Sequence, residues 1–171
     1  MKKELFSWVK SVLIALIVVF ICRQFLFVPV TVKGESMEPT YENNDRIVVT
    51  KVGNIEHFDM VVFHAPDAEK DYIKRVIGLA GDSVEMKDDV LYINGKQYKE
   101  PYVESKKEEI QSDENLTENF DVKVPKGTLF VMGDNRRHSW DSRRFGVIHE
   151  DSLVGKVEFR FFPLNELGAP Q

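Results

Sequence analysis

The feature that most constrains this fold is an apolar run near the start of the chain. Across residues 5–27 the only formally charged side chains are those of Lys10 and Arg23. A membrane-spanning helix needs roughly 20 residues, and long basic side chains extend from such a helix toward the membrane surfaces. Basic residues before the run favour a cytoplasmic N-terminus. The sequence therefore predicts three segments, namely a cytoplasmic N-terminus (residues 1–4), a transmembrane helix (5–27) and an extracytoplasmic domain (28–171).

A cleaved leader peptide is the alternative interpretation of the same run. Leader cleavage requires small residues one and three positions before the cut. Residues 21–27, which follow the apolar core, offer no such pair. Cys22 is the only cysteine, so the chain cannot form an internal disulfide, and the cysteine count does not assign a compartment. We therefore favour a retained helix.

Beyond residue 28 the pattern changes to short apolar runs separated by turn residues, which is typical of β-strands. Asn94 and Gly95 form a dipeptide that favours a two-residue hairpin turn. Residues 99–119 are acidic and low in apolar content, which predicts a mobile surface loop. The expected strands lie at residues 28–32, 46–51, 59–64, 72–78, 83–86, 90–98, 120–124, 128–133 and 153–162. The predicted fold is mostly β, with partly closed antiparallel sheets behind one N-terminal transmembrane helix.

The charge distribution argues against nucleic acid as a partner. The net charge is −5, and residues 1–30 contribute +3, which leaves −8 for the rest of the chain. Binding to phosphate groups depends on Lys and Arg side chains, so an acidic body is poorly suited to it. The Cys and His residues show no zinc-type spacing. We therefore predict no metal site and no cofactor.

Ser36 is the first candidate for chemistry. It lies in a short polar stretch, residues 34–40, only a few residues after the apolar run ends. This position would hold its hydroxyl near a membrane surface. A serine nucleophile needs a base within hydrogen-bond reach. Four histidines are available, but each is equally well explained as an ordinary surface or core residue, and Ser36 lies in no Gly-x-Ser-x-Gly elbow: His57, His64, His138 and His149.

Lys74 is the other candidate base. In an alternating strand its side chain shares a face with Tyr72 and Val76, which can remove it from water. An ordinary lysine has a pKa of about 10.4, and burial can lower that value by as much as ~3–5 units. A lysine in such a setting can accept the serine proton. The alternative interpretation is a solvated strand residue with no catalytic part.

A third cluster occupies residues 133–143, which combine small, hydroxyl and oppositely charged side chains. An active-site support loop needs groups that orient a base and neutralise nearby charge. Ser139 or Ser142 can hydrogen-bond a lysine amine, and the two aspartates of the loop can pair with Arg75 or Arg143. A tight surface turn with mixed charges is the competing interpretation of this stretch.

Residues 34–40, 72–82 and 133–143 resemble, in order, the motif boxes of bacterial type I signal peptidases, and residues 59–63 resemble a fourth box. The resemblance implies a Ser-Lys dyad of the single-span type, with Ser36 as nucleophile and Lys74 as general base. It also implies that Ser139 orients the lysine amine. Gly34 stands where some relatives have a serine that helps to form the oxyanion hole. The implied supporting charges are Asp141 with Arg143 and Asp134 with Arg75.

The resemblance further implies a substrate and a location. Secretory preproteins would be cut after small-x-small sequences such as Ala-x-Ala, with the peptide added to a strand edge. The implied location is the bacterial plasma membrane, with membrane phospholipid as a second partner. Met37 and the apolar stretch before it would dip into the lipid surface. The residues implied to line shallow substrate pockets are Val30, Val32, Met37, Tyr72 and Ile73.

Two other functions use some of the same features. A non-enzymatic β-domain tethered to a membrane would share the helix and the strand edges while it binds peptides or partner proteins. A self-cleaving repressor with a Ser-Lys dyad would share the chemistry. The repressor needs a DNA-binding helix-turn-helix, and the apolar run stands in its place.

Overall fold

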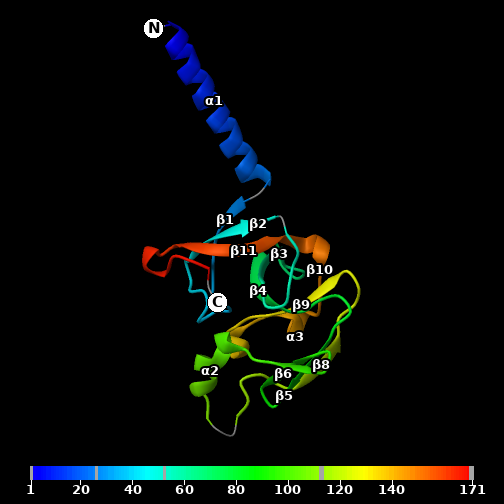
Figure 1. Ribbon diagram of the computed structural model, residues 1–171. Helices are drawn as coiled ribbons and strands as arrows, with labels where there is room; N and C mark the ends of the chain where they lie inside the picture. Colours follow the sequence, from blue (N-terminus) through cyan, green and yellow to red (C-terminus); the bar gives the residue numbers. More distant parts are fainter. Residues whose placement is uncertain (1, 26, 52, 112–113, 170–171) are drawn as a thin grey trace.

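The computed structural model describes residues 2–25, 27–51, 53–111 and 114–169. Residues 1, 26, 112 and 113, which fall inside segments predicted above, lie outside this description, as do residues 52, 170 and 171. The chain forms one long N-terminal helix and a body of β-strands (Figure 1). This arrangement confirms the predicted mostly β class with antiparallel sheets.

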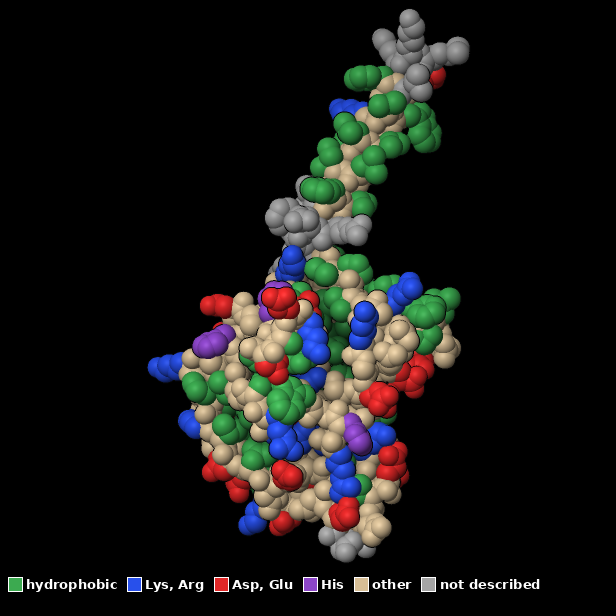
Figure 2. Space-filling model, turned by 180° about the vertical axis from the view of Figure 1, so that it is seen from behind, with side chains coloured by type: hydrophobic (Ala, Val, Ile, Leu, Met, Phe, Trp, Pro, Cys, Tyr) green, Lys and Arg blue, Asp and Glu red, His purple; other side chains and the backbone are tan. Residues whose placement is uncertain are grey.

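Helix α1 runs from Lys2 to Phe25 and projects away from the β body (Figure 1). Its visible face is largely hydrophobic (Figure 2), and large apolar side chains such as Leu16 and Phe20 are more than 60% exposed. Across the described residues, we find no helix with the length and apolarity required to cross a membrane. The transmembrane segment over residues 5–27 therefore stays a prediction.

Among the described residues the body contains two antiparallel sheets. The larger has seven strands in the order β1-β2-β11-β3-β4-β9-β10, and the smaller has four in the order β7-β6-β5-β8. The smaller sheet lies at the end of the body opposite α1 (Figure 1). The strands of the larger sheet are β1 (Phe27–Thr31), β2 (Arg46–Thr50), β3 (Met60–His64), β4 (Asp71–Gly78), β9 (Thr128–Met132), β10 (Ile148–His149) and β11 (Leu153–Phe162). Those of the smaller are β5 (Ser83–Lys87), β6 (Val90–Ile93), β7 (Lys96–Tyr98) and β8 (Phe120–Lys123).

Strand β4 lies inside the larger sheet, between two other strands. It pairs with β3 on one side and β9 on the other, and Lys74 is directly opposite Val61 in the β3 register. The predicted hairpin is present between β6 and β7, where Asn94 and Gly95 both adopt positive φ angles, as a type I′ turn requires. Three clusters of buried apolar side chains fill the body, two of them against the larger sheet and one under the smaller sheet.

Residues 99–119 differ from the predicted surface loop. The segment contains a 3₁₀ helix, η1 (Pro101–Val103), and a short α-helix, α2 (Glu104–Glu108). Val103 is fully buried, and Glu100 and Thr117 are buried on either side of it. The physical reason is the buried Arg136, whose charge is neutralised by Glu100. The prediction of a plain loop is therefore corrected to a segment anchored at both ends.

Four more short helices lie between or after the strands in the described part of the chain. Helix α3 (Ser142–Phe145) begins after Asp141, whose side chain accepts a hydrogen bond from the Arg143 backbone N–H, as an N-cap residue does. Sequence patterns did not predict this helix. The remaining helices are the 3₁₀ turns η2 (Arg136–His138), η3 (Glu150–Ser152) and η4 (Leu164–Glu166).

Candidate active site

Ser36 and Lys74 are brought into direct contact by the fold. The Lys74 Nζ atom lies 2.7 Å from Ser36 Oγ and 2.9 Å from the carbonyl oxygen of Ile73. Only 3% of Lys74 is exposed, because it lies on a central strand of the larger sheet. The Nζ atom is also 5.3 Å from the ring centroid of Tyr72, so the two share a face of β4 as the alternation predicts. Serine and lysine are therefore placed for proton exchange.

The environment lowers the pKa of Lys74 to about 8. Burial is the largest cause, because it penalises the charged amine. The carboxylates of Asp141 and Asp134 act in the opposite direction, and the charge of Lys70 lowers the pKa further. At pH 7 roughly one amine in ten is then neutral, compared with fewer than roughly one in a thousand at the ordinary pKa. A usable fraction of this lysine can therefore act as a base at neutral pH.

The loop after β9 holds the backbone on either side of the serine. The Asn135 N–H donates to the carbonyl oxygen of Ser36 at 3.1 Å, and its side-chain amide donates to the carbonyl oxygen of Glu35 at 3.0 Å. The Thr40 hydroxyl donates to Asp134 in the same loop. These contacts clamp the turn that carries Ser36 onto the sheet that carries Lys74, and they fix the distance between the two side chains.

Arg75 and Asp134 form a buried ion pair behind the dyad. Two guanidinium nitrogens of Arg75 donate to the two oxygens of Asp134 at 2.9 and 2.6 Å. A third nitrogen donates to the carbonyl oxygen of Phe58, and the guanidinium stacks 3.8 Å from the ring centroid of Tyr102. Forked pairing of this kind satisfies both charges in a buried setting.

Asp141 and Arg143 form a second pair in the same loop. Arg143 donates to both oxygens of Asp141 at 2.8 and 2.7 Å, and the Gly133 N–H donates to the same carboxylate at 3.0 Å. Burial acts to raise the pKa of Asp141, but these hydrogen bonds and the charge of Arg143 hold it below its ordinary value. The aspartate is therefore ionised at neutral pH and faces the lysine as a negative charge.

Comparison with known proteins identifies the family of the chain. The family model described as "Signal peptidase, peptidase S26" matches residues 5–162 of the chain. The chain belongs to the signal peptidase family.

Relatives within this family cover almost the whole chain. "Signal peptidase IB" of Staphylococcus aureus (strain Mu50 / ATCC 700699) is 46% identical over 181 residues, which cover 97% of this chain and 94% of that protein. "Signal peptidase I P" of Bacillus subtilis subsp. natto is 46% identical over 173 residues, with the same coverage. A crystal structure of a signal peptidase I from Enterococcus faecalis V583 matches with a TM-score of 0.60 and 38% identity, over 62% of this chain and 98% of that one.

Ser139, which the signal peptidase resemblance assigns to orienting the lysine, is not bonded to it in this structure. Its Oγ atom is buried and has no hydrogen-bond partner among the described residues. The hydroxyl is close enough to the Asp141 carboxylate to help lower the pKa of that group, but it does not meet the geometry of a hydrogen bond. A Cβ atom at Gly133 would collide with the Ser139 side chain and with the carbonyl oxygen of Ser36, so glycine is required for this close approach.

Gly34 adopts a left-handed conformation, with φ of 87°, and its N–H donates to the Asn43 side chain at 3.0 Å. A side chain at this position would meet no atom within 4 Å, but the positive φ itself favours glycine. The Gly34 N–H already has a partner, so Gly34 shapes the turn before Ser36 rather than offering a hydrogen-bond donor to an oxyanion.

The five residues assigned to substrate pockets lie on two faces of the sheet. Val32, Met37 and Ile73 are buried in one apolar cluster, against which Val30 packs. Tyr72 packs against the cluster on the other face. Met37 is only 1% exposed, so the expectation that it dips into a lipid surface is wrong. The turn that carries Ser36 folds back over the sheet and places this side chain in the core.

The predicted set omitted several residues that complete the site. Arg136 is 3% exposed and is neutralised by the buried Glu100 at 2.5 Å, while its Nε atom donates to the carbonyl oxygen of Gly133. Asn135 supplies the clamp on the serine backbone. The polar cluster at residues 133–143 is the only sequence signal for Arg136 and Asn135, and Glu100, the partner of Arg136, lies in a stretch whose composition predicts a loop. Two of the alternative histidines, His57 and His64, pair instead with aspartates.

Proposed function

We propose that this chain is a serine endopeptidase that removes signal peptides from secretory preproteins, with Ser36 as nucleophile and Lys74 as general base. Family membership supports the activity. One observation carries the residue assignment, namely the 2.7 Å contact between Ser36 Oγ and the buried amine of Lys74. A lysine base is effective near neutral pH only when its pKa is lowered, and burial supplies that change here.

Acylation is the first half of the proposed reaction. In the reactive state the Ser36 hydroxyl donates its hydrogen bond to the neutral Lys74 amine. Lys74 takes this proton as Oγ attacks the carbonyl carbon of the scissile peptide, which produces a tetrahedral oxyanion. The lysine ammonium then gives the proton to the departing amine as the C–N bond breaks. The mature protein leaves, and the signal peptide is held as an ester on Ser36.

Deacylation repeats these roles of the lysine, with water in place of Ser36 as the nucleophile. Lys74 accepts a proton from a water molecule that attacks the ester carbonyl, and it returns the proton to Ser36 Oγ as the ester bond breaks. The oxyanion in both halves requires preorganised donors. The Ser36 backbone N–H is the proposed first donor.

The substrate follows from the family activity and the sheet. β1 ends the strand order of the larger sheet and pairs only with β2 among the described strands. An extended peptide can add to this edge and present alternate side chains to the apolar cluster that holds Val32 and Ile73. Val32 and Ile73 are almost fully buried, so this edge offers little room and would suit small side chains such as those of an Ala-x-Ala site.

We further propose that α1 anchors the protein in the bacterial plasma membrane, with residues 1–4 cytoplasmic and residues 28–171 outside. The support is a 24-residue helix that projects from the body with exposed apolar side chains (Figures 1 and 2). The double substitution Leu16→Glu/Ile17→Glu should release the protein from membranes washed at alkaline pH. Retention of this variant in the membrane fraction would contradict anchoring by α1.

The decisive test uses the purified full chain in detergent with a preprotein that contains one Ala-x-Ala site. We expect cleavage at that site, and we expect Ser36→Ala and Lys74→Ala each to reduce the rate by at least ~10²-fold. Ser83→Ala and Lys123→Ala, on the smaller sheet, are matched controls that should retain the parent rate. Cleavage by the Lys74→Ala protein at the parent rate would refute the dyad, and an inactive parent would favour a non-enzymatic peptide-binding domain.

A further inference from the structure

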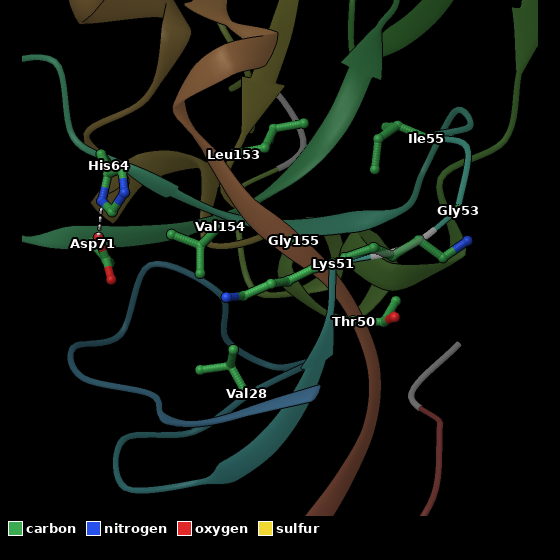
Figure 3. A pocket seen from close by; sticks show the side chains of 11 residues that line it. Val28, Thr50, Lys51, Gly53, Ile55, His64, Asp71, Leu153, Val154 and Gly155 are labelled. Carbon is green, nitrogen blue, oxygen red and sulfur yellow. Dashed lines mark hydrogen bonds and ion pairs between the residues drawn. The ribbon is translucent and has the colours of Figure 1, made fainter. Parts of the chain in front are cut away.

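A cavity of about 530 Å³ lies among β1, β3, β4 and β11, outside the Ser-Lys dyad (Figure 3). We name it the anchor-side pocket, because its β1 wall begins only two residues after α1 ends. Four apolar side chains contribute to its walls, and the charged or titratable side chains among its lining residues are two lysines and a His–Asp pair. The apolar four are Val28, Ile55, Leu153 and Val154, and the others are Lys51, Lys156, His64 and Asp71.

The anchor-side pocket borders the apolar cluster that contains the chain neighbours of Ser36 and Lys74. Val28 and Val154 pack against the buried cluster that contains Met37 and Ile73. Met37 is the chain neighbour of Ser36, and Ile73 is the chain neighbour of Lys74. The pocket also includes Asp71, at the start of β4, three residues before Lys74. Three residues of strand span about 10 Å. A peptide cut at the dyad can therefore reach the pocket within a few residues.

The alternation of β1 selects which substrate residue arrives there. Val28 and Val30 are half-buried and face the apolar cluster, whereas Pro29 and Thr31 are exposed. A peptide strand added to this edge also alternates its side chains with a period of two. The first, third and fifth residues before the scissile bond then face inward. In this register the first and third residues would lie near the dyad and Val30, and the fifth would lie at the level of Val28.

We propose that the anchor-side pocket receives the side chain of the fifth residue before the scissile bond and selects a branched apolar side chain there. This inference rests on the proposed function, and it assigns a second recognition element in addition to the Ala-x-Ala pockets. A leucine side chain at this position would contact Val28 and Val154. In Figure 3 these two side chains point toward one another, with the Lys51 side chain extending between them.

The charges of the pocket exclude a basic side chain. The Lys51 amine extends into the cavity in Figure 3. Lys156 lines the same cavity and pairs with Asp59 at 3.1 Å, and His64 is held 2.7 Å from Asp71 at the rim. A lysine from the substrate would meet the Lys51 amine in a partly enclosed space, where like charges repel more strongly than in water. A leucine instead contacts the apolar walls and the methylene groups of Lys51.

The test compares preproteins that share one Ala-x-Ala site and differ only at the fifth residue before it. We expect kcat/KM to fall in the order leucine, alanine, lysine, with leucine about tenfold above alanine. The same substitutions at the fourth residue, whose side chain points away from the pocket, should change kcat/KM by less than about twofold. Equal rates for leucine and alanine at the fifth residue, or a preference for glutamate over leucine, would overturn the proposal.

Two variants of the full chain connect the preference to the pocket. Val154→Trp fills the cavity and should abolish the ratio between leucine and alanine substrates, whereas Val122→Trp, a half-buried valine on the smaller sheet, should preserve it. Lys51→Glu should raise cleavage of the lysine substrate relative to the alanine substrate by about tenfold. This gain cannot arise from misfolding. An unchanged leucine-to-alanine ratio in Val154→Trp, or no gain with Lys51→Glu, would refute the assignment.

Cleavage of the alanine substrate distinguishes a failure of the pocket assignment from a failure of the proposed function. If the parent cleaves it and Ser36→Ala does not, the proposed function stands and only the pocket assignment is under test. If the parent cleaves no substrate in the series, the proposed function fails before the pocket is reached.

Discussion

The charge of Lys70 should tune the catalytic lysine, and its reversal gives a quantitative test of the base. The amines of Lys70 and Lys74 lie 5.2 and 5.3 Å from the centroid of the same Tyr72 ring. The two amines are therefore at most about 10.5 Å apart. Lys70 is exposed, so the substitution Lys70→Glu should not disturb folding. It replaces a positive charge, which disfavours protonation of Lys74, with a negative charge that favours it.

The size of the effect follows from Coulomb's law. Two unit charges 10 Å apart interact by about 0.4 kcal/mol in water, which corresponds to about 0.3 in the pKa of one partner. Reversal of the charge doubles this change, so Lys70→Glu should raise the apparent pKa by about 0.6 at low ionic strength. The neutral variant Lys70→Met should raise it by about 0.3. A Debye length of about 10 Å at 0.1 M salt means that both changes should shrink markedly in 0.5 M salt.

The assay is kcat/KM for a single Ala-x-Ala preprotein between pH 5.5 and 9.5. Below its pKa the Lys74 amine is protonated and cannot accept the serine proton, so the rate should rise with pH and level off above about pH 8. With Lys70→Glu the rising limb should move to higher pH while the plateau remains at the parent level. Lys126→Glu makes the same charge change in the loop before β9 and serves as the control. A flat parent profile, or a limb that moves to lower pH in Lys70→Glu, would refute Lys74 as the base.

Three further substitutions test the buried polar groups. Lys74→Met should stabilise the fold by up to about 3 kcal/mol below pH 8, where the native state must bury a charged amine, and the gain in urea unfolding should vanish above about pH 10.5, where the amine is neutral in both states. Glu100→Gln should cost about 3–5 kcal/mol in the same assay, because it leaves Arg136 buried without its partner. Ser139→Ala should change the free energy of unfolding by less than about 1 kcal/mol, because the Ser139 hydroxyl makes no hydrogen bond among the described residues. A fall in kcat in this stable variant would show that Ser139 orients the lysine. A kcat equal to that of the parent would exclude that role.

Local sequence patterns predicted most of the strands. Alternation and turn residues located β2, β3, β4 and β11 to within about two residues, because strand boundaries in this chain coincide with Gly, Pro, Asn and Asp. The hairpin at Asn94 was equally local. Helix α3 was not predicted, because four residues carry too little periodicity to distinguish a helix from a loop.

The site was harder to predict, because its contacts join distant parts of the chain. Arg75 and Asp134 are 59 residues apart, and local patterns could offer them only as possible partners. The pairing of Arg136 with Glu100 was missed, because an acidic stretch gives no sign of which carboxylate becomes buried. Met37 was misplaced for a related reason, since an apolar residue beside a predicted membrane helix can face either lipid or core.

The two arginine–aspartate pairs have a consequence for catalysis that goes beyond packing. Asp134 and Asp141 both act to raise the pKa of Lys74, which on its own would leave the base protonated at neutral pH. Each carboxylate accepts hydrogen bonds from two guanidinium nitrogens of one arginine: Asp134 from Arg75, and Asp141 from Arg143. The positive charge of each paired arginine opposes the negative charge that the lysine experiences. Loss of either arginine should therefore raise the pKa of Lys74 and leave less neutral amine at pH 7, even where the fold survives. An alkaline shift of the activity profile would distinguish that outcome from simple destabilisation.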